Sequence, residues 1–148
     1  MKIIMKINGH ISLGAKTMKQ RIIALLSATI FATASLALAA PKAPLSTLVL
    51  SQSIGKGKPT LVFFQNPNGG PCKAQQQVLD KLTEKRKGTF TVAPVNAMEQ
   101  NDQKAFYDYG VRSLPSLVLV DKVGSISKVF PPGIQSIETI SAELDGLK

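Results

Sequence analysis

The chain has 148 residues, of which 44% are hydrophobic and 18% charged. This balance suits one globular domain and excludes a chain that is disordered throughout. It holds one cysteine and one histidine. A single cysteine excludes an internal disulfide and a zinc site built on cysteines. The histidine, His10, lies in a segment that we expect to be removed, which excludes catalytic triads and histidine-ligated metals. We therefore expect no metal and no cofactor.

More than half of the formal net charge of +9 lies near the amino terminus. Residues 1–39 carry five basic and no acidic side chains, and residues 40–148 carry 13 basic and nine acidic ones. The densest basic run, Lys85-Arg86-Lys87, has no aromatic residues interleaved for stacking on single-stranded nucleic acid. It also fits the end of a helix, where cations are favoured by the helix dipole. We expect no nucleic-acid partner.

Residues 18–40 have the pattern of a secretory signal. A basic stretch, residues 18–21, precedes 19 uncharged residues, Ile22 to Ala40, which include the small-residue motif Ala37-Leu38-Ala39. We expect cleavage after Ala39, which makes residues 1–39 an amino-terminal extension and signal peptide and residues 40–148 the folded domain. The alternative is an uncleaved membrane anchor, because 19 apolar residues nearly span a bilayer. The pattern leaves open whether Met1 or Met18 is the start.

Export predicts a location in the periplasm, or attachment to the membrane if the signal segment is retained. The periplasm is an oxidising space. One unpaired cysteine in such a compartment indicates a buried thiol, an intermolecular partner or a reactive site.

In chain order, residues 41–44 are predicted to be an extended linker and residues 45–54 a helix that ends at a Gly- and Pro-containing turn. Residues 60–64 are continuously apolar and β-prone, which is typical of a central strand covered on both faces. A loop then leads to Pro71, which suits the first turn of a helix. We expect that helix to run to about Arg86.

A second strand is predicted at residues 90–95, where Pro94 indicates an edge or a strand end. Asn101 or Asp102 is expected to cap a helix through Tyr109. The remaining elements are a hairpin of residues 117–120 and 126–130 and a last helix capped by Ser136. The order predicts an α/β three-layer sandwich, with helices on both faces of a central mixed sheet of about four strands.

Cys72 is the first candidate for chemistry. It follows Gly69, Gly70 and Pro71 at the junction between the first strand and the next helix. Unpaired N–H groups and the positive end of the dipole in the first turn of a helix stabilise a thiolate over a thiol. Lys73 adds a positive charge beside it.

Leu114-Pro115 is the second candidate. A proline at the entry to a buried strand removes a hydrogen-bond donor from the ladder, so its presence needs a reason. A cis peptide bond in a tight turn is one such reason.

These motifs resemble those of the thioredoxin superfamily. Residues 60–64 take the place of its central strand, and residues 68–73 stand where the family has Trp-Cys-Gly-Pro-Cys-Lys. Residues 78–82 match the continuation of the helix, and residues 111–117 look like the segment that carries the family's cis-proline. Residues 121–126 fit the following hairpin. The resemblance extends over nearly the whole chain after residue 44 and implies a thioredoxin-like fold.

The departures from the family pattern concern its chemistry. Gly69 replaces the cysteine that attacks substrates, so Cys72 matches only the resolving cysteine. Phe63 stands where many thioredoxins bury an aspartate, Asn68 replaces the active-site tryptophan, and Gln77 replaces a helix-kinking proline. The chain therefore lacks the two-thiol cycle and is not expected to be a two-cysteine disulfide reductase.

Several functions remain open at this point. Cys72 could act alone in thiol–disulfide exchange or redox sensing, with a protein or peptide thiol, a disulfide or glutathione as partner. A buried, inert Cys72 is the competing interpretation, since free cysteines are often structural. The resemblance also implies that Leu114 and Pro115 bind an extended peptide, so a redox-silent peptide-binding or chaperone-like module is the alternative. Peroxide reduction is less favoured, because the sequence lacks the Thr-x-x-Cys of peroxiredoxins.

Overall fold

A computed structural model describes residues 39–147 of the chain. Residues 1–38 lie outside the described residues. They include both candidate start residues and all of the predicted signal pattern except Ala39 and Ala40. The domain boundary at residue 39 therefore stays a prediction. No helix in residues 39–147 has both the length and the apolar character needed to cross a bilayer.

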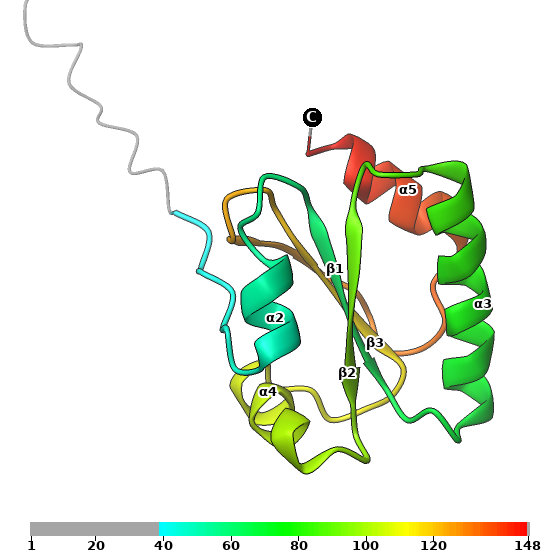
Figure 1. The fold of residues 1–148 in the computed structure, drawn as a ribbon. Helices are drawn as coiled ribbons and strands as arrows, with labels where there is room; N and C mark the ends of the chain where they lie inside the picture. Colours follow the sequence, from blue (N-terminus) through cyan, green and yellow to red (C-terminus); the bar gives the residue numbers. More distant parts are fainter. Residues whose placement is uncertain (1–38, 148) are drawn as a thin grey trace, which may run out of the picture. The chain divides into compact units, whose positions relative to one another are not determined.

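Four strands and their helices follow one another in the predicted order (Figure 1). The helices are α2 (Leu48–Ser53), α3 (Gly70–Lys85), α4 (Gln103–Asp108), which follows a short 3₁₀ turn (Gln100–Asp102), and α5 (Ile137–Asp145). The strands are β1 (Thr60–Gln65), β2 (Thr91–Asn96), β3 (Ser116–Val120) and β4 (Ile126–Val129). The predicted elements agree with these to within a few residues.

The sheet has the order β2-β1-β3-β4. Strand β1 pairs with β2 in parallel and with β3 in antiparallel orientation, and β3 pairs with β4 in antiparallel orientation. The mixed four-stranded sheet is thus confirmed, with the continuously apolar β1 in its centre. Pro94 lies on the edge strand β2 and is exposed, which agrees with the rule that proline avoids central strands.

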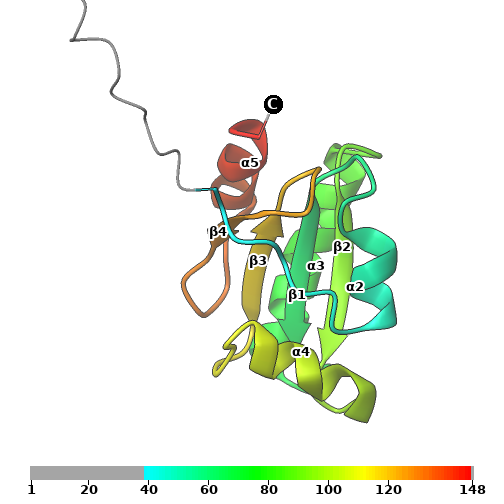
Figure 2. The ribbon, with the colours of Figure 1, turned by 90° about the vertical axis from the view of Figure 1, so that its left-hand side faces the viewer.

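Helices cover both faces of the sheet (Figures 1 and 2). Alternate residues of β1 point to opposite faces, so Leu61 and Phe63 join the core under α3 and α5 while Val62 and Phe64 join the core under α2 and α4. All four side chains are completely buried. Because the apolar residues of β1 serve two cores, the strand is held in one position relative to both helical layers.

The segment before the first helix, residues 41–44, is predicted from the sequence to be an extended linker, and the structure adds that it pairs with the sheet domain. The Ala43 N–H donates to the Gly124 carbonyl at 2.9 Å, and the Ile126 N–H donates to the Pro41 carbonyl at 2.8 Å. These bonds place residues 41–43 beside the turn that precedes β4 and beside Ile126, the first residue of β4. Ala43 is buried there because its side chain joins the core under α2 and α4.

The helix caps confirm one prediction and correct another. Ser136 caps α5, where its hydroxyl accepts the Thr139 N–H at 3.2 Å. Asp102 does not cap α4 with its side chain, since its carboxylate accepts the Asn96 N–H at 2.7 Å. The carboxylate thereby closes the turn after β2, and the 3₁₀ turn of residues 100–102 directly precedes α4.

Candidate functional site

Cys72 lies in the first turn of α3, as predicted. Its sulfur accepts the backbone N–H of Asn66 at 3.3 Å, and the residue is only 3% exposed. A hydrogen bond donated to sulfur favours the charged thiolate, as does the amino-terminal end of a helix. The sulfur therefore lies next to a backbone N–H donor in the first turn of α3, beneath the protein surface.

A tight turn before α3 positions the sulfur. The Asn66 side-chain oxygen accepts the Asn68 N–H at 3.0 Å, and the Asn66 carbonyl accepts the Gly69 N–H at 2.9 Å. Gly69 is the residue before the helix, and its carbonyl accepts the Lys73 N–H at 3.0 Å. Pro71 lies in the first turn, where its missing N–H removes no helical hydrogen bond.

The two glycines of the motif have different surroundings. A Cβ atom on Gly69 would lie 3.7 Å from the Cys72 sulfur and 3.3 Å from the Asn66 carbonyl oxygen. A Cβ atom on Gly70 would have no neighbour within 4 Å. Position 69, and not position 70, therefore faces the sulfur. Lys73 is exposed, so solvent screens the effect of its charge on the sulfur.

The Leu114–Pro115 peptide bond is cis. Pro115 is buried and its carbonyl accepts the Gly133 N–H at 3.0 Å, while Leu114 is half-buried. Ser116, the next residue, pairs with Phe64 near the end of β1. Since β1 leads through Asn66 to the turn that holds Cys72, both sequence motifs lie at the carboxyl end of β1.

Two residues that hold this end together were not identified by the sequence patterns. One is Asn66, whose backbone N–H donates to the Cys72 sulfur. Because almost any residue has a backbone N–H, this contact requires no particular side chain at position 66. The other is Gln75, which is fully buried on α3. Its side-chain oxygen accepts the Gln135 N–H at 2.6 Å and its amide group donates to the Gln135 carbonyl at 3.4 Å. A polar residue on the inward side of a helix is the one signal that could have identified Gln75.

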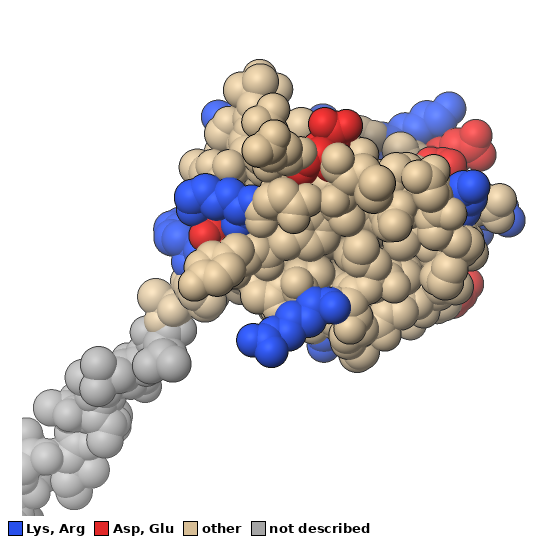
Figure 3. Space-filling model, turned by 90° about the horizontal axis from the view of Figure 1, so that it is seen from below, with Lys and Arg blue, Asp and Glu red and all other residues tan. Residues whose placement is uncertain are grey.

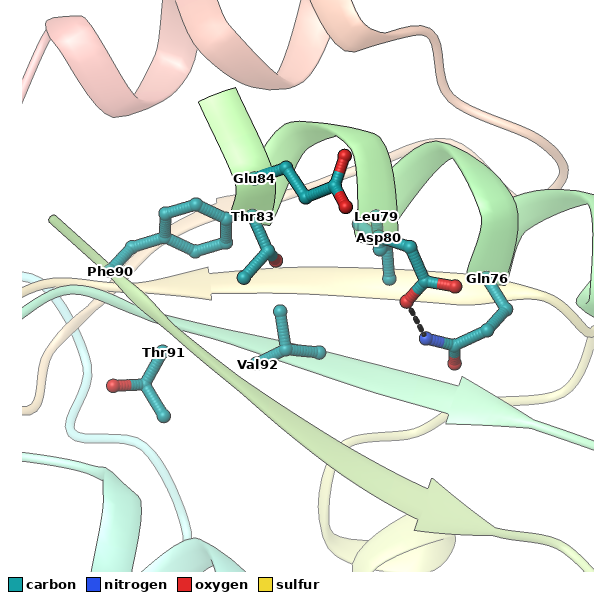
Figure 4. Close-up of a pocket in the computed structure, with 8 residues that line it drawn as sticks. All are labelled: Gln76, Leu79, Asp80, Thr83, Glu84, Phe90, Thr91 and Val92. Atoms are coloured by element: carbon teal, nitrogen blue, oxygen red, sulfur yellow. Dashed lines mark hydrogen bonds between the residues drawn. The ribbon is translucent and has the colours of Figure 1, made fainter. Parts of the chain in front are cut away.

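A hollow of about 510 Å³ lies between α3 and the edge strand β2 (Figure 4). Two of its polar residues, Gln76 and Asp80, satisfy each other through a hydrogen bond of 2.8 Å (Figure 4). Cys72 is not among the residues that line it. Within residues 39–147 no group of three or more His, Cys, Asp or Glu side chains is arranged to hold a metal ion.

The family model of the thioredoxin-like domain matches residues 48–148. The chain belongs to this family. The family membership supports a role in thiol redox chemistry in general, and it confirms the resemblance inferred from the motifs at Cys72 and Pro115.

Thioredoxins from several bacteria are similar to this thioredoxin-like chain. The thioredoxin of Alicyclobacillus acidocaldarius is 30% identical over 93 residues, which are 63% of this chain and 85% of that protein. The thioredoxin of Pseudomonas aeruginosa is 35% identical over 77 residues, covering 47% and 69% of the two chains. Thioredoxin 1 of Nostoc sp. is 38% identical over 61 residues, which are 41% of this chain and 55% of that protein. The match thus spans just over half of the Nostoc protein.

Solved structures show the same fold. A thioredoxin-like protein from Clostridium perfringens has a TM-score of 0.57 and 25% identity, over 65% of this chain and 82% of its own. An exposed lipoprotein thioredoxin from Streptococcus pneumoniae has a TM-score of 0.54 and 22% identity, over 62% and 87% of the two chains. The latter similarity concerns the fold alone.

Proposed function

We propose that this protein is exported to the periplasm and acts in thiol redox chemistry through Cys72 alone. The observation that carries the proposal is the contact between the sulfur and the Asn66 N–H in the first turn of α3. A thiolate is the nucleophile in thiol–disulfide exchange, and this geometry places the sulfur of the only cysteine in the chain beside a hydrogen-bond donor at the start of a helix.

The proposed reaction needs a disulfide as co-reactant. The Cys72 thiolate attacks one sulfur of a disulfide in a protein, a peptide or oxidised glutathione, and the other sulfur leaves as a thiolate. The product is a mixed disulfide on Cys72. A second thiol then attacks the partner's sulfur, which releases Cys72 as a thiolate and transfers the disulfide to the incoming thiol. Without a cysteine at position 69, the chain cannot resolve the mixed disulfide by itself.

Because Cys72 is only 3% exposed, the proposed reaction requires a local opening, which we assign to the corner formed by residues 66–70 that precedes the sulfur. Among the described glycines, Gly69 alone is a position where an added Cβ would lie within 4 Å of the sulfur. A local opening of this corner leaves both hydrophobic cores intact. The reaction should therefore be faster than global unfolding permits.

The test is the rate at which the native full-length chain forms a mixed disulfide with oxidised glutathione, followed by mass. We expect reaction without denaturant, and Gly69→Ala should slow it, because the new methyl group would lie 3.7 Å from the sulfur. Gly70→Ala is the matched control, since its methyl group would have no neighbour within 4 Å. Equal rates in the two variants would contradict the proposal, as would reaction only in denaturant.

Peptide binding without redox turnover is the second candidate. It is supported by Leu114, whose N–H and C=O make no backbone hydrogen bond with the other described residues. An extended peptide could pair with these two groups in the manner of an added strand. The Cys72→Ser variant separates the two functions. Partner capture that persists unchanged in this variant would favour peptide binding and contradict the redox proposal.

A further inference from the structure

The basic residues of the described chain are concentrated at one end of the sheet, opposite the end that holds Cys72. This end consists of the segment around Lys42, the loop 55–59, the end of α3 with residues 85–89, the turn 121–125 and the end of α5 with residues 144–147 (Figure 1). We call it the basic pole. It holds seven basic side chains and two acidic ones, a formal charge of +5. The other described residues hold five basic and seven acidic ones, a formal charge of −2.

Direct contacts bring these segments together. The Lys42 ammonium group donates to the Val123 carbonyl at 2.9 Å. The Lys58 ammonium group lies 3.9 Å from the place where a Cβ on Gly88 would be. A hollow of about 340 Å³ is lined jointly by residues of the loop, both helix ends and the turn. The lysines converge although they are far apart in the sequence.

The acidic residues of the basic pole are already engaged. The Asp121 carboxylate accepts the N–H groups of Val123 and Ser125 within its own turn. Asp145 pairs with Arg86 at 2.6 Å. The exposed lysines at positions 42, 56, 58, 85, 87 and 122 thus dominate the surface charge of this end.

The opposite end of the molecule has a different surface. Figure 3 views the chain from below Figure 1, which is the end where β1 leads to Cys72. Most of the surface seen there is neither basic nor acidic, and the charged side chains are scattered. The chain therefore has one strongly cationic end and one end of nearly neutral surface.

The chain also enters the fold at the basic pole. Residues 41–43 run along the turn 121–125 through the backbone bonds described above. Val123 adds an apolar side chain, 64% exposed, at the tip of the turn and next to Lys122.

We propose that the basic pole docks on the surface of an anionic phospholipid membrane, with the Cys72 end facing away from it. Lysines near such a surface are attracted by its negative potential, at about 1 kcal/mol for each lysine. The exposed apolar side chain of Val123 at the tip of the turn favours a lipid surface over a nucleic acid. This inference goes beyond the proposed redox function and does not depend on it.

The test uses the absence of tryptophan from the chain. Two single-tryptophan variants of the full-length chain, Val123→Trp and Met98→Trp, report on the two ends, since these residues are 64% and 63% exposed. Vesicles of phosphatidylglycerol or of phosphatidylcholine carry a headgroup quencher. We expect phosphatidylglycerol vesicles to quench the tryptophan at position 123 strongly and the one at position 98 weakly. High salt should reduce the quenching, because it screens exposed charges.

Charge variants complete the test. We expect a triple variant to lower the affinity for phosphatidylglycerol vesicles on the order of a hundredfold, about fivefold for each lysine. This variant combines Lys56→Gln, Lys58→Gln and Lys122→Gln. The quenching at position 123 should then fall to the level at position 98. The control removes three charges elsewhere, with Lys81→Gln, Lys104→Gln and Arg112→Gln, and should leave the quenching unchanged. Equal quenching at both ends, or equal quenching by both lipids, would overturn the proposal. Tighter binding to an oligonucleotide than to phosphatidylglycerol at the same salt would also overturn it.

Discussion

The two ends of the sheet differ in how their polar groups are arranged, since they are buried and paired at one end and exposed at the other. At the carboxyl end of β1, buried polar groups are paired with the backbone, as Gln75 is with Gln135 and the Cys72 sulfur is with Asn66. At the other end, six exposed lysines lie on segments that meet around a hollow, and Lys122 is among the residues that line it. The first arrangement holds buried polar groups in one geometry, and the second presents charge at the surface. The comparison shows that one small domain has a buried polar site at one end and a cationic surface at the other.

The largest effect that we expect comes from restoring a second thiol at the Cys72 end. The parent chain should show negligible reduction of insulin by a dithiol, because one thiol cannot resolve a mixed disulfide. Gly69→Cys should give measurable turnover, since its Cβ would lie 3.7 Å from the Cys72 sulfur, a separation compatible with a disulfide after a small adjustment.

Gly70→Cys is the matched control for this variant. Its Cβ has no neighbour within 4 Å, so the new thiol would face away from Cys72. This variant should stay inactive in the insulin assay. Turnover by the parent chain, or equal turnover by the two cysteine variants, would show that Gly69 is not the missing position.

A smaller effect concerns the buried polar pairing at the same end. Gln75→Ala leaves the Gln135 N–H and C=O without their partner inside the protein, and we expect a loss of about 2–3 kcal/mol in the free energy of unfolding. Urea denaturation measures this loss. Gln76→Ala removes a surface hydrogen bond to Asp80 and should cost less than about 0.5 kcal/mol. Similar losses in both variants would contradict the role given to Gln75.

The smallest effect on stability that we expect concerns the hydrogen bond between Tyr109 and Pro44. The Tyr109 hydroxyl donates to the Pro44 carbonyl at 2.9 Å, and the ring packs on Phe64. Burial, and then the charge of Asp108, raises the pKa of Tyr109 from 10.0 to about 12. The folded state therefore favours the neutral phenol. Its contribution to stability is complete below pH 10 and is lost as the pH rises through about 12.

The Tyr109→Phe variant tests the contribution of this hydrogen bond to stability. We expect a loss of about 1 kcal/mol at neutral pH from the missing hydrogen bond, and a weaker decline in stability between pH 10 and 12 than in the parent chain. Tyr107→Phe is the control, because Tyr107 is 87% exposed. Thermal unfolding across this pH range measures both. If the two variants had the same pH dependence, the contact with Pro44 would contribute nothing.

Much of the fold follows from local patterns in the sequence. The apolar run of β1, the cap at Ser136 and the proline on the edge strand each depend on residues that are neighbours in the chain. Such patterns act through the backbone of their own segment, so they can be recognised without tertiary structure. The position of Cys72 in the first turn of α3 belongs to the same group.

Other features depend on contacts between distant segments, and only the tertiary structure decided them. The pairing of residues 41–43 with the turn before β4 adds to the local expectation of an extended linker, and the bond of Asp102 to Asn96 replaces the expected side-chain cap. The burial of Cys72 and the gathering of lysines at one end are results of packing and strand register. Local preferences amount to fractions of a kcal/mol per residue, and the burial of apolar side chains in two shared cores outweighs them.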